Sequence, residues 1–164
     1  MIRPATPGDA PCLADIYNPY ITDTVITFEE EPISAQEMEE RIRKVMATYP
    51  WIVWEEDGQV LGYAYASSWR SRHAFRFAVE TTIYMDMGHH GKGIGEKLYR
   101  ALVQALRERG FHSALGCLAL PNGPSVALHE KLGFTKVGHM REAGWKFSRW
   151  VDVGFWELLL DRNP

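Results

Sequence analysis

The sequence has few cysteines and no long apolar run. Its two cysteines, Cys12 and Cys117, lie far apart, so they form neither a zinc-binding pair nor a disulfide framework. This usage is typical of proteins from reducing compartments. No apolar stretch reaches the roughly 20 residues that a membrane-spanning helix needs, and residues 1–5 lack the apolar core of a signal peptide. We therefore expect a cytoplasmic protein that does not contact a membrane.

The sequence also lacks an excess of positive charge. It holds 18 Lys and Arg against 21 Asp and Glu, which gives a formal net charge of −3 at pH 7. Binding to a phosphate backbone needs a basic face, so we expect no nucleic-acid partner. Repeats, low-complexity stretches and linkers are absent as well, and the length suits one domain over residues 1–164.

The histidines do not form a metal-binding pattern. His89 and His90 are adjacent, and neighbouring histidines rarely share one ion. His112 lies far from both of them in the sequence. We therefore expect no metal cofactor.

The apolar periodicity predicts an α/β domain with helices around one mixed sheet. Thr6 and Pro7 favour a helix start, and Ser34 begins a capping box. Asp57 and Gly58 between two apolar segments predict a hairpin. The expected strands cover residues 2–5, 51–54, 60–66, 75–87, 114–120, 134–139 and 151–160. The expected helices start near residues 6 and 34 and cover residues 93–108 and 125–132.

Aromatic residues gather near the C-terminus at spacings that are mostly those of an alternating strand. We interpret them mainly as strand core. They are Trp145, Phe147, Trp150, Phe155 and Trp156.

The most informative segment is residues 83–95, where an apolar strand leads through closely spaced glycines into an amphipathic helix. Backbone amides at such a helix start point outward at its positive end, where they bind phosphate oxygens. Glycine lets a phosphate approach main chain that a side chain would otherwise cover. The segment predicts a phosphate-bearing cofactor, and the alternative is a glycine turn that only joins strand to helix.

Two better-known glycine motifs do not fit this segment. A Walker A loop needs Ser or Thr after its lysine, and Gly93 follows Lys92. A dinucleotide fingerprint needs its third glycine one position after Gly95, where Glu96 stands. Both motifs are therefore excluded.

Residues 90–95, His-Gly-Lys-Gly-Ile-Gly, resemble the acetyl-CoA signature of the GNAT acetyltransferases, Gln/Arg-x-x-Gly-x-Gly/Ala. His90 departs from it, because Gln or Arg is usual there. A second segment, residues 122–125 followed by residues 129–134, is similar to the family's Asn-x-x-Ser/Ala and Gly-Phe pattern. Both motifs have the family's order and separation, so the resemblance implies a GNAT fold and acetyl-CoA as cosubstrate.

Within that family, nearly the whole chain resembles the phosphinothricin and methionine sulfoximine acetyltransferases. The segments that carry this resemblance are residues 16–18, 49–51, 62–66, 69–72, 79–84, 120–122, 144–147 and 152–156. It implies N-acetylation of the α-amino group of a small amino-acid-like substrate, and a homodimer whose interface includes part of the C-terminal aromatic residues. An acetyltransferase for a polyamine or a protein N-terminus, and a non-catalytic acetyl-CoA sensor, are the alternatives.

The same resemblance implies which residues contact acetyl-CoA, mainly through the main chain of the strand and the glycine loop. They are Ile83, Tyr84, Met85, His90, Gly91, Lys92, Gly93, Ile94, Gly95, Glu96 and Asn122.

Acetyl transfer to an amine needs a base for the ammonium, donors for the oxyanion and, where required, a proton for the thiolate. The resemblance places Glu80 at the family's catalytic base. It places His129 where the phosphinothricin branch has His and many relatives have a Tyr proposed to protonate the thiolate. Burial in an apolar strand would raise the pKa of Glu80 and make it a better base. From the residues alone, a Glu80 that faces solvent or pairs with Arg76, and a His129 on a surface helix, are the alternatives.

The resemblance also implies a set of substrate contacts. Arg70 and Arg72 would hold the anionic end of the substrate, since guanidinium groups bind carboxylates in a bidentate way; two solvated charges are the alternative. Phe28 and Phe75 would form apolar walls of the substrate pocket, and Thr82 would be a further substrate contact.

Overall fold

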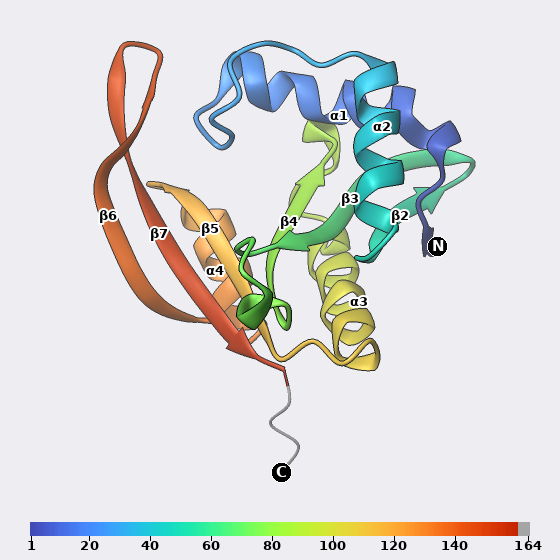
Figure 1. Cartoon of the computed structure of the whole chain (residues 1–164). Helices are drawn as coiled ribbons and strands as arrows, with labels where there is room; N and C mark the ends of the chain where they lie inside the picture. Colours follow the sequence, from blue (N-terminus) through green and yellow to red (C-terminus); the bar gives the residue numbers. More distant parts are fainter. Residues whose placement is uncertain (161–164) are drawn as a thin grey trace.

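The computed structural model describes residues 1–160, which form a seven-stranded mixed sheet with helices on both faces (Figure 1). The strand order is β1-β2-β3-β4-β5-β7-β6. The strands are β1 (Ile2–Pro4), β2 (Trp51–Glu56), β3 (Gln59–Ser68), β4 (Ala78–Met85), β5 (Ser113–Leu120), β6 (Thr135–Lys146) and β7 (Arg149–Leu159). The helices are α1 (Ala10–Asp23), α2 (Ala35–Met46), α3 (Ile94–Glu108) and α4 (Gly123–Lys131), with 3₁₀ turns η1 (Pro7–Asp9), η2 (His73–Phe75) and η3 (Met87–His89).

Two clusters of buried side chains hold the helices onto opposite faces of the sheet. Val53 of β2 belongs to the cluster under α1 and α2, and its neighbour Ile52 belongs to the cluster under α3. This is the alternation that a strand covered on both faces requires. On α3, Leu98, Leu102 and Leu106 are fully buried at helical spacing, as the sequence predicts. None of the helices in residues 1–160 combines the length and apolar character that a bilayer crossing demands.

Local signals explain where several elements begin and turn. Ser34 caps α2, because its hydroxyl accepts a hydrogen bond from the Glu37 amide at 3.1 Å. Asp57 and Gly58 both have positive φ, 50° and 78°, as a tight turn between β2 and β3 requires. The predicted hairpin at Asp57 and Gly58 and the helix start predicted at Ser34 are thus confirmed.

The predicted lengths of three strands are wrong. The strand expected over residues 75–87 is β4, Ala78–Met85, because the chain forms 3₁₀ turns on both sides of it. The two last strands are longer than expected, because β6 and β7 continue past the sheet as a hairpin. Phe147 and Ser148 turn this hairpin with φ values of 51° and 55°.

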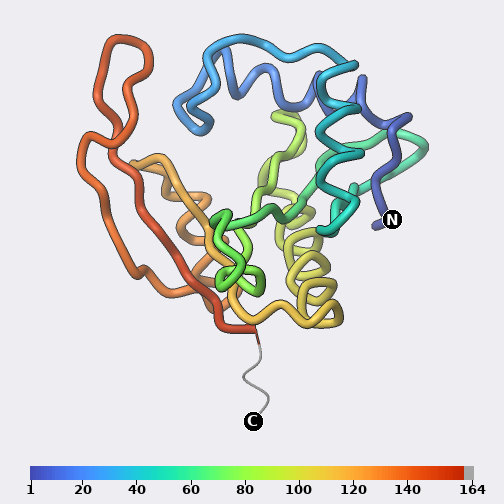
Figure 2. Tube along the Cα trace, in the orientation of Figure 1, coloured from blue at the N-terminus to red at the C-terminus, as the bar shows by residue number. Residues whose placement is uncertain are grey.

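Three aromatic residues near the turn of this hairpin are not core, contrary to the sequence interpretation. Trp145, Phe147 and Trp150 are 52%, 53% and 57% exposed, whereas Trp156 is buried. The reason is that β6 pairs only with β7, so the far end of the hairpin extends beyond the layers of the domain. Figure 2 shows the hairpin rising beside the segment that follows α1.

The strands β4 and β5 separate part of the way along the sheet. They pair in parallel from Ala78 to Thr81 and from Ser113 to Gly116, and no pairing continues beyond. β4 then runs on to Met85, while β5 continues to Leu120 paired only with β7. Figure 1 shows the two strands diverging. Their separation leaves a gap in the sheet between β4 and β5.

Candidate active site

At this divergence, part of the main chain of β4 turns its hydrogen-bonding groups away from β3. The Asp86 amide donates to the Leu61 carbonyl at 2.8 Å, and the antiparallel register continues from there along β3 and β4. In an antiparallel pair, successive residues direct their N–H and C=O groups alternately toward and away from the neighbouring strand. Tyr84 therefore directs its main-chain groups to β3, while Ile83 and Met85 direct theirs to the gap. Of the three strand residues predicted to contact acetyl-CoA, Ile83 and Met85 therefore have the suitable backbone direction.

The glycine loop lies at the start of α3 and lines a cavity of about 400 Å³. Gly91 and Gly93 have φ values of 77° and 75°, and a Cβ built at either would meet nothing within 4 Å. Gly93 is the N-cap of α3, whose first amides have no acceptor within the helix. Open space over left-handed glycines at a positive helix end fits a pyrophosphate group. The lining of this cavity includes Ile83, Met85, residues 90–96 and Asn122.

His90, which replaces the usual Gln or Arg, is bonded to α1. The Tyr20 hydroxyl donates to the Met85 carbonyl at 2.6 Å and lies 2.8 Å from His90 Nε2. Since that hydroxyl has one hydrogen, Nε2–H of His90 donates to the Tyr20 oxygen. His90 thereby joins the glycine loop to α1 and to the end of β4.

A second cavity of about 370 Å³ lies at the same gap and contains Glu80. Burial raises the pKa of Glu80, and the thiol of Cys117, which hydrogen-bonds its carboxyl, opposes this effect. In turn, burial and the nearby carboxyl raise the pKa of Cys117 to about 12. Both cavities include Ile83, Asn122 and Ser125 in their linings. The carboxyl thus lies where an elevated pKa suits a general base.

His129 lines the second cavity but is almost fully buried on α4. Its Nδ1 lies 2.7 Å from the Ser125 carbonyl oxygen, and its Nε2 lies 3.0 Å from the Tyr99 hydroxyl. Burial lowers the pKa of His129, so the neutral imidazole is favoured. Both ring nitrogens are occupied by protein groups.

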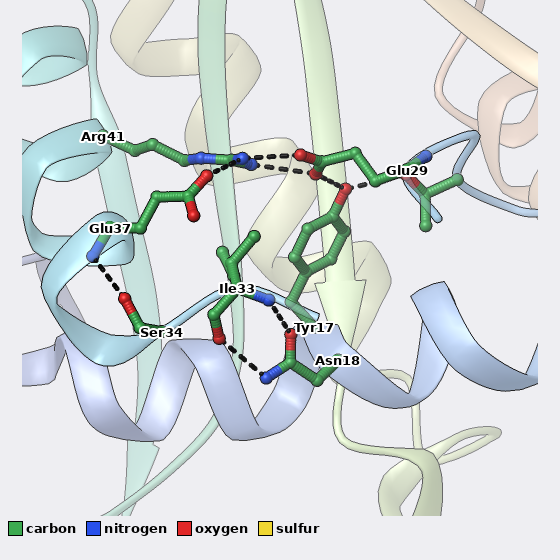
Figure 3. Close-up of polar contacts among 8 residues, drawn as sticks. Tyr17, Asn18, Glu29, Ile33, Ser34, Glu37 and Arg41 are labelled. Carbon is green, nitrogen blue, oxygen red and sulfur yellow. Dashed lines mark hydrogen bonds and ion pairs between the residues drawn. The ribbon is translucent and has the colours of Figure 1, made fainter. Parts of the chain in front are cut away.

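The segment between α1 and α2 forms one wall of the second cavity through Phe28. Arg41 of α2 donates to the Glu29 carboxylate from its two terminal guanidinium nitrogens, Nη1 at 2.8 Å and Nη2 at 2.5 Å (Figure 3). The Tyr17 hydroxyl also donates to Glu29. Arg41, as the strongest influence, lowers the pKa of Glu29. Asn18 of α1 exchanges two hydrogen bonds with the main chain of Ile33, at 3.0 and 2.9 Å. The wall is therefore fixed at several points.

The hairpin of β6 and β7 holds the same wall from the other side. Lys146, 2% exposed, donates from Nζ to the Thr27 carbonyl at 2.8 Å. A Cβ on Gly144 would lie 2.2 Å from the Phe28 ring, so the ring packs directly on that main chain. Sequence patterns contain no signal for this contact, because Lys146 and Thr27 are 119 residues apart.

The structure gathers some of the predicted substrate residues and leaves others apart. Phe28 and Thr82 line the second cavity together with Glu80 and His129. Arg70, Arg72 and Phe75 are exposed in the segment between β3 and β4 and line neither of these two cavities. Three further residues of the site have no recognisable signal in the sequence: Cys117, Tyr99 and Lys146.

The described part of the chain contains no cluster of side chains that could bind a metal ion. Among residues 1–160, no three His, Cys, Asp or Glu side chains come together as metal ligands would.

Comparison with known proteins agrees with this geometry. Residues 2–154 match the family model described as the acetyltransferase (GNAT) domain. The chain is 42% identical over 156 residues to a phosphinothricin N-acetyltransferase of Streptomyces viridochromogenes, covering 95% of this chain and 85% of that protein. It is 34% identical over 166 residues to an L-methionine sulfoximine/L-methionine sulfone acetyltransferase of Salmonella typhimurium, covering 99% and 95%.

A solved structure shows the same similarity in three dimensions. It is a putative acetyltransferase from Salmonella typhimurium with its cofactor acetyl-CoA, which superposes with a TM-score of 0.96 at 34% identity, covering 100% of this chain and 95% of that one. The family match extends over nearly all of the chain, and the relatives match it over nearly their full lengths. The chain therefore belongs to the GNAT family of N-acetyltransferases, in its phosphinothricin and methionine sulfoximine branch.

Proposed function

We propose that this N-acetyltransferase moves the acetyl group of acetyl-CoA to the α-amino group of small amino-acid-like substrates of the phosphinothricin, methionine sulfoximine and methionine sulfone type. The observation that carries the proposal is the pair of cavities at the β4 and β5 divergence. One contains the glycine cradle, by which we mean the main chain around Gly91 and Gly93 at the start of α3. The other contains the carboxyl group of Glu80, whose pKa is raised. The relatives' names support the class of substrate.

In the proposed reaction, Glu80 accepts a proton from the substrate ammonium, directly or through water. The freed amine nitrogen bonds to the acetyl carbonyl carbon, and the bond from that carbon to sulfur breaks. The sulfur leaves as the thiolate of coenzyme A, and the nitrogen gives up a second proton to that thiolate or to water. The products are then the neutral amide and coenzyme A, so atoms and charge balance. An outward main-chain N–H of β4 donates to the carbonyl oxygen while negative charge develops on it.

Binding of acetyl-CoA is assigned to groups on three elements. Gly91 and Gly93 admit the pyrophosphate to the main chain at the start of α3. The main chain of Ile83 and Met85 holds the pantetheine arm along the gap. Asn122, which lines both cavities, is a further contact.

Recognition of the amino acid is assigned to the second cavity and its surroundings. Phe28 and Thr82 contact the substrate side chain. Arg70 and Arg72 bind its anionic end, a role that rests on the family resemblance, and Phe75 adds apolar surface. We further propose a homodimer that covers part of the exposed hairpin, and a sedimentation mass of one chain at micromolar concentration would reject it.

The test is a thiol-release assay with acetyl-CoA and a panel of amines. We expect turnover with phosphinothricin, methionine sulfoximine or methionine sulfone, and little with a polyamine or an alanine-terminated peptide. Turnover confined to the polyamine or the peptide would move the substrate assignment to that class. Tight acetyl-CoA binding by calorimetry without turnover of any amine would instead favour a sensor.

A further inference from the structure

A chain of buried hydrogen bonds links α4 to the sheet at the point where β4 and β5 separate. It runs from the Ser125 carbonyl to His129 Nδ1 at 2.7 Å, and from His129 Nε2 to the Tyr99 hydroxyl at 3.0 Å. It continues to the Thr81 hydroxyl at 2.6 Å and ends at the Leu115 carbonyl at 3.0 Å. Four contacts therefore join two carbonyl groups through three side chains.

Counting hydrogens determines the direction of these bonds. A carbonyl only accepts, so Nδ1 of His129 carries a hydrogen for Ser125. A neutral ring then presents Nε2 as an acceptor, and the Tyr99 hydroxyl must donate to it. The Thr81 hydroxyl donates to the Leu115 carbonyl, and in this neutral network the same hydrogen is shared with the Tyr99 oxygen. The neutral network has three hydrogens for four contacts, and only a protonated imidazole would supply the fourth.

Burial decides between these two states. His129 and Thr81 are 2% and 5% exposed, and Tyr99 is fully buried. Within residues 1–160, the two nitrogens of the imidazole face a carbonyl and a hydroxyl, and no carboxylate contacts the ring. A charged ring without a counter-ion is costly in such a place. The neutral state, with its hydrogen on Nδ1, is therefore favoured.

The position of the network explains what it does. Thr81 and Gly116 form the last bridge between β4 and β5, and Glu80 directly precedes Thr81. A Cβ on Gly116 would lie 2.3 Å from His129 Nε2, so the imidazole rests on the main chain of that bridge. The network thus connects α3, α4, β4 and β5 where the gap opens.

We propose that Tyr99 is a positioning residue, whose hydroxyl holds His129 as the Nδ1–H tautomer and ties α4 to the last bridge of β4 and β5. His129 then acts on the reaction through the shape of the gap, because neither ring nitrogen is available to a substrate. This inference rests on the proposed function only for its effect on turnover. The tautomer is a property of the folded protein alone.

The first experiment is NMR spectroscopy of the protein labelled with ¹⁵N in histidine, without ligand and near neutral pH. We expect the His129 ring to show a hydrogen-bearing Nδ1 and an unprotonated Nε2. A hydrogen on Nε2, in the neutral or the charged ring, would overturn the proposal. Because this measurement needs no turnover, it decides the inference even if no amine is acetylated.

The second experiment compares Tyr99→Phe with Tyr49→Phe, a matched control whose ring stacks on Phe111 away from the two cavities. Loss of one buried neutral hydrogen bond predicts a fall in kcat of about 10-fold for Tyr99→Phe. The acid limb of the pH profile should stay in place, since Glu80 remains the base. A kcat within twofold of the control, or a displaced limb, would contradict the positioning role.

A double-mutant cycle separates the positioning role from direct proton transfer by His129. If Tyr99 acts through His129, adding Tyr99→Phe to His129→Gln should lower kcat little further. Full additivity of the two losses would show that the residues act independently. Should the wild type acetylate no amine, the proposed function fails while the NMR result still stands.

Discussion

Lys146 Nζ donates to the Thr27 carbonyl at 2.8 Å, which joins the tip of the last hairpin to the segment that carries Phe28. The lysine is 2% exposed and also lies near the Phe147 ring, 5.0 Å from its centroid. The wall of the second cavity is therefore held by the hairpin of β6 and β7 as well as by α1 and α2. A contact between such distant segments makes the shape of this cavity depend on the whole fold.

Replacing this lysine should loosen the wall. Lys146→Met leaves the buried Thr27 carbonyl without its donor, which should cost about 1–3 kcal/mol of unfolding free energy. We expect KM for the amine to rise while KM for acetyl-CoA changes little, because the glycine loop is not touched. Urea unfolding and steady-state kinetics measure the two effects. Lys44→Met on the exposed face of α2 is the control, and equal behaviour of the two variants would refute the contact's importance.

Removing the carboxyl of Glu80 should lower kcat. We expect Glu80→Gln to reduce it by about 10²–10⁴-fold at moderate pH, the usual contribution of a general base. The loss should shrink as pH rises, because the amine then loses its proton without help. The measurement is the pH profile of kcat, with Glu56→Gln on the exposed end of β2 as control. A loss that does not vary with pH would exclude Glu80 as the base.

The thiol of Cys117 should lower the pKa of Glu80. Burial raises the pKa of Glu80 above its ordinary 4.5, and the Cys117 hydrogen bond partly opposes the rise. Activity should therefore fall as pH drops through the raised pKa. Cys117→Ala removes the donor and should move this acid limb of kcat/KM to higher pH, whereas Cys117→Ser should keep it near the wild-type position. A limb that moves to lower pH in the alanine variant would contradict this relationship.

The glycine at the start of α3 offers a clean test of acetyl-CoA binding. Gly93 and Gly110 have nearly equal φ values, 75° and 76°, and open space around a built Cβ. Gly93→Ala and Gly110→Ala should thus cost similar stability, about 1–2 kcal/mol. Only Gly93→Ala places a methyl group in the cradle, so it alone should weaken binding of coenzyme A, by about 10-fold or more. Calorimetry on both variants measures this affinity. Equal affinities of the two variants for coenzyme A would contradict a role of Gly93 in binding it.

Stability should depend on pH through His129. Burial lowers its pKa from the ordinary 6.5, so the unfolded chain binds this proton more readily than the folded protein does. The stabilisation that neutral His129 provides is therefore full above pH 6.5 and is lost as pH falls through the lowered pKa. We expect the difference in unfolding free energy between the wild type and His129→Gln to be smaller at about pH 5.5 than at about pH 7.5. A difference that grows on acidification would contradict the buried neutral state.

Gly116→Ala should reproduce part of the His129 defect. The added methyl group would meet the imidazole at 2.3 Å, so the ring must move away from Tyr99. We expect lower kcat and an altered ¹⁵N spectrum of His129. Gly123→Ala is the control, because a Cβ there meets nothing within 4 Å. An unchanged His129 spectrum in Gly116→Ala would show that the ring does not rest on this glycine.

Features that depend on neighbouring residues could be predicted from the sequence alone. The Ser34 cap, the Asp57-Gly58 turn and the apolar face of α3 follow from backbone sterics, hydrogen bonding and helical period. The glycine cradle belongs to the same class, because left-handed backbone at Gly91 and Gly93 is a local property. These local rules were enough to indicate a phosphate-bearing ligand.

Features that depend on distant partners were decided only by the tertiary structure. The same alternation that predicts a buried strand left Trp145 and Trp150 exposed, because no helix or strand of residues 1–160 covers these two side chains. The pKa of Glu80 rises because the folded chain removes it from water, and His129 loses both ring nitrogens to partners on α4 and α3. Sequence determined the local conformation of this protein, and burial by distant segments determined what its titratable side chains do, since desolvation depends on everything packed around a group.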